Sequence, residues 1–176
     1  MNQRSRVLVG VAVAICLSIG VTSLAHPQAH SPQSNPTQKK AAMPSHANGT
    51  FEVTVKPQPT DDKTEGSTLG RMSLDKQFHG DLEGTSKGEM LTTGTPVKGS
   101  GAYVAIEVVS GTLRGRSGTF VLQHSGTMTH GVPQLTITVV PDSGTGQLLG
   151  LAGRMDIKIS EGKHSYDFEY TLAETP

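Results

Sequence analysis

The chain has 176 residues, and its 15 lysines and arginines balance its 15 aspartates and glutamates, so the formal net charge is zero. Because the longest basic run is Lys39–Lys40, nothing indicates a nucleic-acid-binding surface, and we expect no nucleic-acid partner. The single cysteine, Cys16, lies in an apolar N-terminal segment. The rest of the chain therefore excludes disulfides, thiolate metal sites and thiol nucleophiles.

Residues 1–25 predict a secretory signal peptide. Two arginines precede an apolar stretch from Val7 to Val21, and small residues flank a cleavage position after Ala25. The alternative, an uncleaved membrane anchor, is disfavoured because a span needs about 20 apolar residues and this stretch is at the short edge. We expect a mature protein that begins at His26, is secreted or periplasmic, and keeps no stable membrane span.

Residues 26–48 predict a disordered linker rich in Pro, Gln, Ser and Asn. Such a composition cannot bury enough apolar surface to offset the entropy of ordering the chain. The linker carries His26, His30 and His46, which could hold a metal ion weakly. A solvated polar segment is the favoured interpretation, so no metal site is predicted. The folded domain is then expected over residues 49–176.

The domain reads as all-β. Its longest stretch without Gly or Pro, Lys163 to Thr175, alternates apolar with polar residues, and no segment shows a helical stripe. The predicted strands are Thr50–Lys56, Thr68–Phe78, Asp81–Thr92, Gly101–Val109, Thr119–Met128, Gln134–Val140, Arg154–Ser160 and His164–Ala173. About eight antiparallel strands in one domain favour a single closed β-barrel, because closure removes exposed sheet edges.

Two glycine-rich segments predict hairpins within this sheet. Gly111–His124 and Val139–Gly153 place glycines where the backbone must turn, with alternating apolar residues on at least one flank. In the first segment, Arg114–Gly115 are the expected two-residue turn.

The chain resembles a known bacterial family at several of these positions. The resemblance rests on Phe51-Glu52-Val53, on Gly80 to Gly84, on Ala102 to Glu107, and on the two glycine-rich segments. By these residues the chain resembles the domain of unknown function 3224 family, whose fold is an allene-oxide-cyclase-like β-barrel. The resemblance implies that barrel and carries no activity. The sequence departs from the family pattern near Lys56-Pro57-Gln58-Pro59, and no catalytic residue of the plant cyclases aligns with this chain.

The most informative polar residues are Glu107 and His124. An Arg114–Gly115 turn pairs Glu107 with Leu122 and Ala105 with His124, so the carboxyl and imidazole groups become diagonal neighbours on one face. The same face carries Tyr103, Val109, Phe120 and Leu122. Two ionisable groups on an apolar face are costly unless they are paired.

Three functions fit this face. The leading prediction is a barrel that binds a small, largely apolar ligand, with ligand-binding residues Tyr103, Glu107, Phe120, Leu122 and His124. The first alternative is an isomerase- or cyclase-like enzyme in which Glu107 is the acid/base and His124 orients it. The second is a filled barrel that serves as a structural or interaction module. The pair itself is either functional or a structural ion pair. The sequence predicts no cofactor and leaves both catalysis and oligomeric state open.

One serine lies in a motif found in hydrolases. Gly84-Thr85-Ser86-Lys87-Gly88 matches the pattern Gly-x-Ser-x-Gly of a nucleophile elbow. That elbow needs a helix after the serine, and none is predicted here, so we do not expect Ser86 to be a nucleophile.

Overall fold

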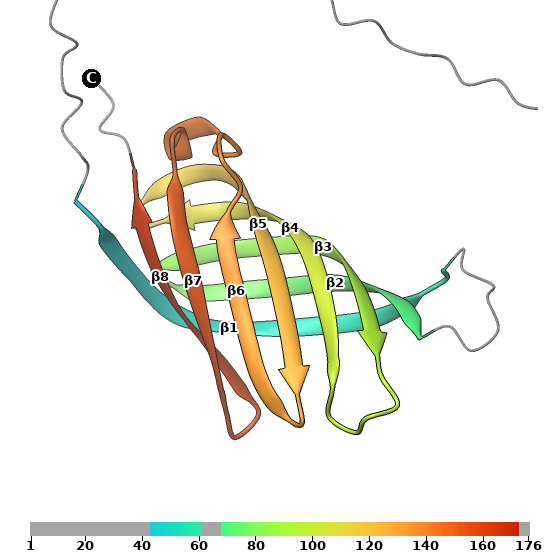
Figure 1. Ribbon diagram of the computed structural model, residues 1–176. Coiled ribbons are helices and arrows are strands. Elements are labelled where there is room, and N and C mark those ends of the chain that lie inside the picture. The colour runs from blue at the N-terminus through green and yellow to red at the C-terminus, as the bar shows by residue number, and fades with distance from the viewer. Residues whose placement is uncertain (1–42, 61–67, 173–176) are drawn as a thin grey trace, which may run out of the picture. The chain divides into compact units, whose positions relative to one another are not determined.

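The computed structural model describes residues 43–60 and 68–172, and the predicted signal peptide and most of the predicted linker lie outside them. Eight strands form a closed antiparallel barrel in which each strand follows its sequence neighbour and β8 pairs with β1 (Figure 1). The strands are β1 (Ser45–Gln58), β2 (Leu69–Gly80), β3 (Leu82–Gly94), β4 (Gly101–Leu113), β5 (Arg116–Thr129), β6 (Val132–Val139), β7 (Ala152–Ser160) and β8 (Lys163–Thr171). The prediction of an all-β, eight-stranded closed barrel is confirmed.

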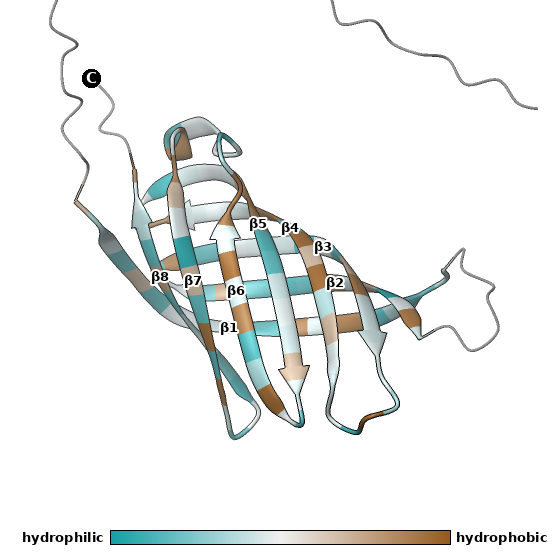
Figure 2. Ribbon diagram, viewed as in Figure 1, coloured by the Kyte–Doolittle hydropathy of each residue, from teal (hydrophilic) through white to brown (hydrophobic). Residues whose placement is uncertain are grey.

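Buried and exposed residues alternate along strands such as β2, β4 and β5. Figure 2 shows bands of differing hydropathy along the ribbon. On β2, Leu74, Lys76 and Phe78 are buried, whereas Asp75 and Gln77 between them are exposed. This period of two is what a half-buried strand requires. It also places one lysine on the inner face.

The first strand starts earlier than predicted. Residues 45–48 were assigned to the linker, but they pair with Asp167–Tyr170 of β8 and so close the barrel. Ala47 is fully buried within this pairing. The polar composition that indicated a linker is compatible with a strand here because the other side chains of this stretch lie toward solvent or are only half-buried.

The β4–β5 hairpin has the predicted register. Arg114 and Gly115 form its turn, with φ angles of 45° and 84°. Two successive positive φ angles are typical of the tight turns whose twist matches that of antiparallel strands. Glu107 therefore faces Leu122, and Ala105 faces His124.

The second glycine-rich segment joins the antiparallel strands β6 and β7, as a hairpin connection does, but through a long docked loop and not a tight turn. Residues 140–151, which include the 3-10 turn η1 (Gly146–Leu148), form a loop between β6 and β7 that packs over one end of the barrel (Figure 1). The Thr145 amide donates to the Thr119 carbonyl at 2.8 Å, and the Val121 amide donates to the Ser143 hydroxyl at 3.1 Å. The loop thus satisfies the backbone of β5 where β6 has already ended. The predicted strands Gln134–Val140 and Arg154–Ser160 leave a connection here, but its docking on β5 does not follow from the sequence pattern.

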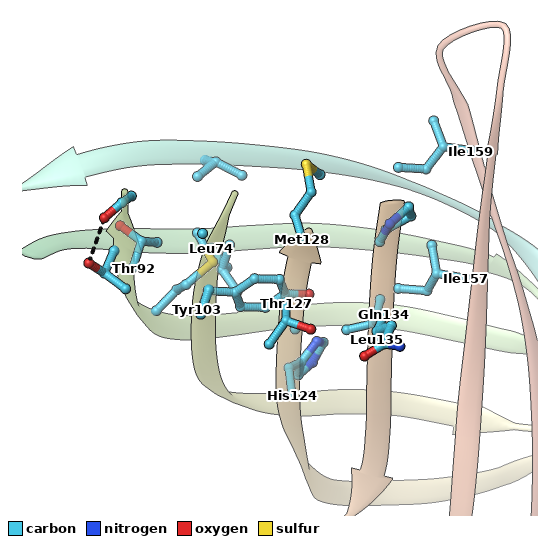
Figure 3. A pocket seen from close by; sticks show the side chains of 18 of the residues that line it. Leu74, Thr92, Tyr103, His124, Thr127, Met128, Gln134, Leu135, Ile157 and Ile159 are labelled. Atoms are coloured by element: carbon cyan, nitrogen blue, oxygen red, sulfur yellow. Dashed lines mark hydrogen bonds between the residues drawn. The ribbon is translucent and has the colours of Figure 1, made fainter. Parts of the chain in front are cut away.

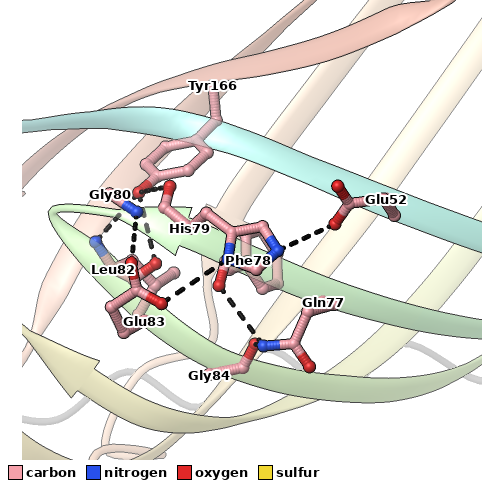
Figure 4. A network of polar contacts seen from close by, with 9 residues as sticks. All are labelled: Glu52, Gln77, Phe78, His79, Gly80, Leu82, Glu83, Gly84 and Tyr166. Atoms are coloured by element: carbon pink, nitrogen blue, oxygen red, sulfur yellow. Dashed lines mark hydrogen bonds and ion pairs between the residues drawn. The ribbon is translucent and has the colours of Figure 1, made fainter.

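The same end is fastened by Tyr166 of β8. Its hydroxyl group accepts a hydrogen bond from the Leu82 amide at 2.9 Å and donates to the His79 carbonyl at 3.3 Å (Figure 4). These bonds tie β8 to the turn between β2 and β3. Because the Tyr166 hydroxyl is largely removed from water, these partners offset the cost of its burial.

At the opposite end the strands β6 and β7 separate. Among the described residues, Thr138 and Arg154 are their one paired position. Beyond it, toward the β5–β6 and β7–β8 turns, the two strands have no further paired positions within the described part of the chain. Backbone pairing around the closed barrel is therefore sparse between these two strands.

Candidate ligand cavity and its buried polar cluster

The open end of the barrel contains a cavity of about 570 Å³. Side chains from all eight strands line it, including Tyr103, His124, Leu135 and Ile157, which converge from β4, β5, β6 and β7 (Figure 3). Other residues of the wall are Phe51, Val55, Leu74, Met90, Met128 and Ile159. A cavity of a few hundred Å³ with apolar walls and a few polar groups is the usual form of a small-molecule site.

The mouth of this cavity is apolar where β6 and β7 separate. Leu135 and Ile159 line the cavity, yet their side chains remain 39% and 67% exposed. In a continuous barrel wall these interior positions would be covered by the neighbouring strand. Their exposure shows that the cavity communicates with solvent on this side.

The base of the cavity carries a buried polar cluster around Glu107. The Lys76 ammonium donates to Oε2 of the carboxylate at 2.6 Å, and the Ser86 hydroxyl donates to Oε1. The Nε2 atom of His124 lies 2.9 Å from Oε2. These four residues come from the adjacent strands β2, β3, β4 and β5, and each is at most 5% exposed. Lys76 and His124 line the cavity, whereas Glu107 and Ser86 lie behind them.

The environment of Glu107 keeps its carboxyl group ionised. Burial raises its pKa, but the contact with His124, the charge and hydrogen bond of Lys76, and the hydrogen bond from Ser86 together outweigh burial. The pKa falls from 4.5 to about 2. The carboxylate thus balances the charge of Lys76 inside the barrel.

His124 is held differently from Lys76. Although its Nε2 atom lies 2.9 Å from the carboxylate, the contact lacks the alignment of a hydrogen bond, and Nε2 is buried without a hydrogen-bond partner. We therefore treat the approach as a close polar contact. A buried ring nitrogen left in this state is costly and is often explained by a ligand or by catalysis.

Lys76 is the member of the cluster that the sequence analysis missed. Its ammonium group lies 5.0 Å from the ring centre of Phe51 and 5.6 Å from that of Phe78, within cation–π range. The signal was present in the predicted strand Thr68–Phe78, because Lys76 shares the alternation of Leu74 and Phe78. A lysine that occupies an interior position of an apolar strand face needs a buried partner.

Tyr103 also contributes to the polar base. Its ring packs over Gly126 on β5, where an added Cβ atom would come within 2.3 Å of the ring. Burial and then the charge of Glu107 raise the pKa of the phenol, so its hydroxyl group keeps its proton at neutral pH. It can donate or accept a hydrogen bond within the cavity.

The predicted ligand-binding residues divide into two groups. Tyr103 and His124 line the cavity, and Glu107 supports His124 from behind. Phe120 and Leu122 do not line it, because both are fully buried in the core that Leu148 and Leu151 help to fill. The loop after β6 brings these leucines to the core, which the sequence analysis did not foresee.

The position of Ser86 does not fit a catalytic triad. In a triad the imidazole lies between the serine and the acid. Here the Glu107 carboxylate lies between Ser86 and His124. Ser86 therefore serves as a hydrogen-bond donor to the buried carboxylate.

The described residues also bear on two further classes of site. They contain no group of three or more His, Cys, Asp or Glu side chains placed to hold a metal ion. Nor do they include a helix of the length and apolarity needed to cross a membrane.

Comparison with known proteins agrees with this fold. The profile of a family described as "Protein of unknown function (DUF3224)" matches residues 47–170. The chain belongs to this family. A crystal structure of a DUF3224 protein of unknown function from Shewanella oneidensis MR-1 superposes with a TM-score of 0.71 and shares 47% sequence identity. The alignment covers 75% of this chain and 100% of the Shewanella chain. Curated proteins gave no match. The predicted family is confirmed, and the allene-oxide-cyclase-like character of the barrel stays a prediction.

Proposed function

We propose that this DUF3224 barrel binds a small, largely apolar molecule in its interior. The observation that carries the proposal is the cavity of about 570 Å³, whose walls are apolar and whose polar groups gather at the base. Sites for small molecules typically measure about 300–1,000 Å³ and combine an apolar wall with a few polar groups. The exposed lining residues Leu135 and Ile159, where β6 and β7 are sparsely paired, mark a route into it.

The alternatives fit the geometry less well. A filled structural barrel has no need for apolar side chains around an open space, and the interior positions of Leu135 and Ile159 are exposed there. Proton transfer by Glu107 is disfavoured because a carboxylate with a pKa of about 2 is a weak base at neutral pH. We therefore propose ligand binding, and not catalysis, as the role of the barrel.

The test is a fluorescence titration with the neutral apolar dye N-phenyl-1-naphthylamine. We expect saturable binding to the purified protein. Met90→Trp should weaken that binding at least about tenfold, because the indole occupies space within the cavity, of which Met90 forms part of the wall. The matched control is Leu91→Trp, which places the same side chain on the outer face, where Leu91 is 49% exposed. Equal effects of both substitutions, or no binding by the parent, would refute the proposal.

A further inference from the structure

The polar base of the cavity is rich in hydrogen-bond donors and poor in free acceptors. A lysine ammonium has three N–H groups, and one of those of Lys76 is directed to Glu107. Both carboxylate oxygens of Glu107 are already engaged, by Ser86 and by Lys76. The carboxylate is fully buried and does not line the cavity. A ligand that reaches this base therefore meets the Lys76 ammonium and the Tyr103 hydroxyl group, which can donate as well as accept, but no free carboxylate.

From this arrangement we propose that the ligand is an amphiphile whose apolar body carries an acceptor oxygen, a carboxylate or a carbonyl, held against Lys76 and His124. This inference rests on the proposed function, since it assumes that the cavity is occupied. The head group would lie at the base, and the apolar body would extend toward Leu135 and Ile159 at the mouth.

Lys76 is built to hold such a head group. Glu107 holds the ammonium at 2.6 Å, and the ring centres of Phe51 and Phe78 lie 5.0 and 5.6 Å from it. The aromatic rings exclude water from the ammonium without supplying hydrogen-bond acceptors of comparable strength. In such a dry environment a charge-assisted hydrogen bond to an incoming oxygen is stronger than in water.

His124 supplies the second donor. Its Nε2 atom has no aligned hydrogen bond, so turning the imidazole toward a ligand oxygen gives up only the 2.9 Å contact with Glu107. The ring is 3% exposed and lines the cavity, so it lies at the inner limit that a head group can reach. A cationic head group, by contrast, would meet the like charge of Lys76 and could not reach Glu107.

The experiment is a displacement series against N-phenyl-1-naphthylamine on the parent protein. Decanoate, methyl decanoate and decylamine share one apolar chain and differ in the head group, and each is used below its micellar concentration. We expect decanoate and methyl decanoate to displace the dye at least about tenfold more effectively than decylamine. A stronger effect of decanoate would identify an anionic head group, and equal effects would show that an acceptor oxygen suffices.

The inference is overturned if decylamine displaces the dye as well as the two oxygen-bearing probes do. That result would leave the proposed function intact, because the dye still binds, whereas failure of the dye itself to bind would refute the proposed function. The uncharged double variant Lys76→Met/Glu107→Gln gives a second measurement. Whatever its own affinity for the dye, it should lose the preference for decanoate over decylamine, and an unchanged preference would overturn the inference.

Discussion

At the end of the barrel that carries the β4–β5 turn, side chains fill the interior, whereas at the opposite end the same eight strands enclose about 570 Å³ of open space. The filled end contains Phe120 stacked on Phe168, with ring centres 5.8 Å apart, together with the fully buried Leu148. The open end has half-buried or exposed apolar side chains on its inner face.

The connections explain the difference between the two ends. At the filled end, the long loop between β6 and β7 folds inward and contributes Leu148 and Leu151 to the core. At the open end, the β5–β6 and β7–β8 connections are tight turns at residues 130–131 and 161–162, too short to fold over the mouth. An eight-stranded barrel is just wide enough either to be filled or to hold one small ligand, and this chain does both.

The largest expected effect lies at the Glu107 cluster, at the base of the open space. Glu107→Gln should lower the free energy of unfolding by about 3–5 kcal/mol, because it leaves the Lys76 ammonium buried without its counter-charge. The double variant Lys76→Met/Glu107→Gln should recover most of that loss, since no unpaired charge remains. Urea unfolding of the parent, both single variants and the double variant measures this coupling. Additive losses in the double variant would contradict it.

Acid should weaken the same cluster. The pKa of Glu107 is depressed in the folded protein, from 4.5 to about 2, so its stabilising effect is complete above pH 4.5. As the pH falls from 4.5 toward 2, about 3 kcal/mol of that stabilisation should be lost. Urea unfolding across this range tests the prediction. Glu107→Gln should flatten the profile, whereas Glu89→Gln at an exposed ion pair on the outer face should not.

Alanine substitutions at two adjacent leucines test whether the loop between β6 and β7 packs into the filled end. Leu148→Ala should cost about 2–3 kcal/mol, because the side chain is fully buried and its loss leaves a void in the core. Leu149→Ala should change the free energy of unfolding by no more than about 0.5 kcal/mol, since Leu149 is 66% exposed. Similar small effects of both substitutions would mean that the loop does not close this end.

The sequence predicts the barrel and the register of β4 and β5 because both follow from local rules. A period of two defines the inner face of a strand, and the Arg114–Gly115 turn fixes which residues of β4 and β5 are opposite. With the turn known, the proximity of Glu107 and His124 follows from geometry.

Other features could not be predicted because they depend on contacts distant in the sequence. Lys76 on β2 and Glu107 on β4 are separated by β3, so their contact depends on the registers of both the β2–β3 and the β3–β4 pairs. No single turn determines both registers. The docking of residues 140–151 depends on backbone groups of β5 that β6 leaves unpaired. Phe120 and Leu122 were expected at the ligand because a strand pattern does not show which half of the barrel is filled.

The smallest effect on stability is expected at the mouth. Ile159 is an interior position that is nevertheless 67% exposed, so Ile159→Ser should change the free energy of unfolding by no more than about 0.5 kcal/mol. The same substitution should weaken binding of N-phenyl-1-naphthylamine a few-fold, because it removes one apolar contact worth about 1 kcal/mol or less. Urea unfolding and the dye titration, run on the same samples, separate the two effects. A loss of stability well above 1 kcal/mol would show that the mouth packs shut in solution, and the contrast between the two ends would then no longer hold.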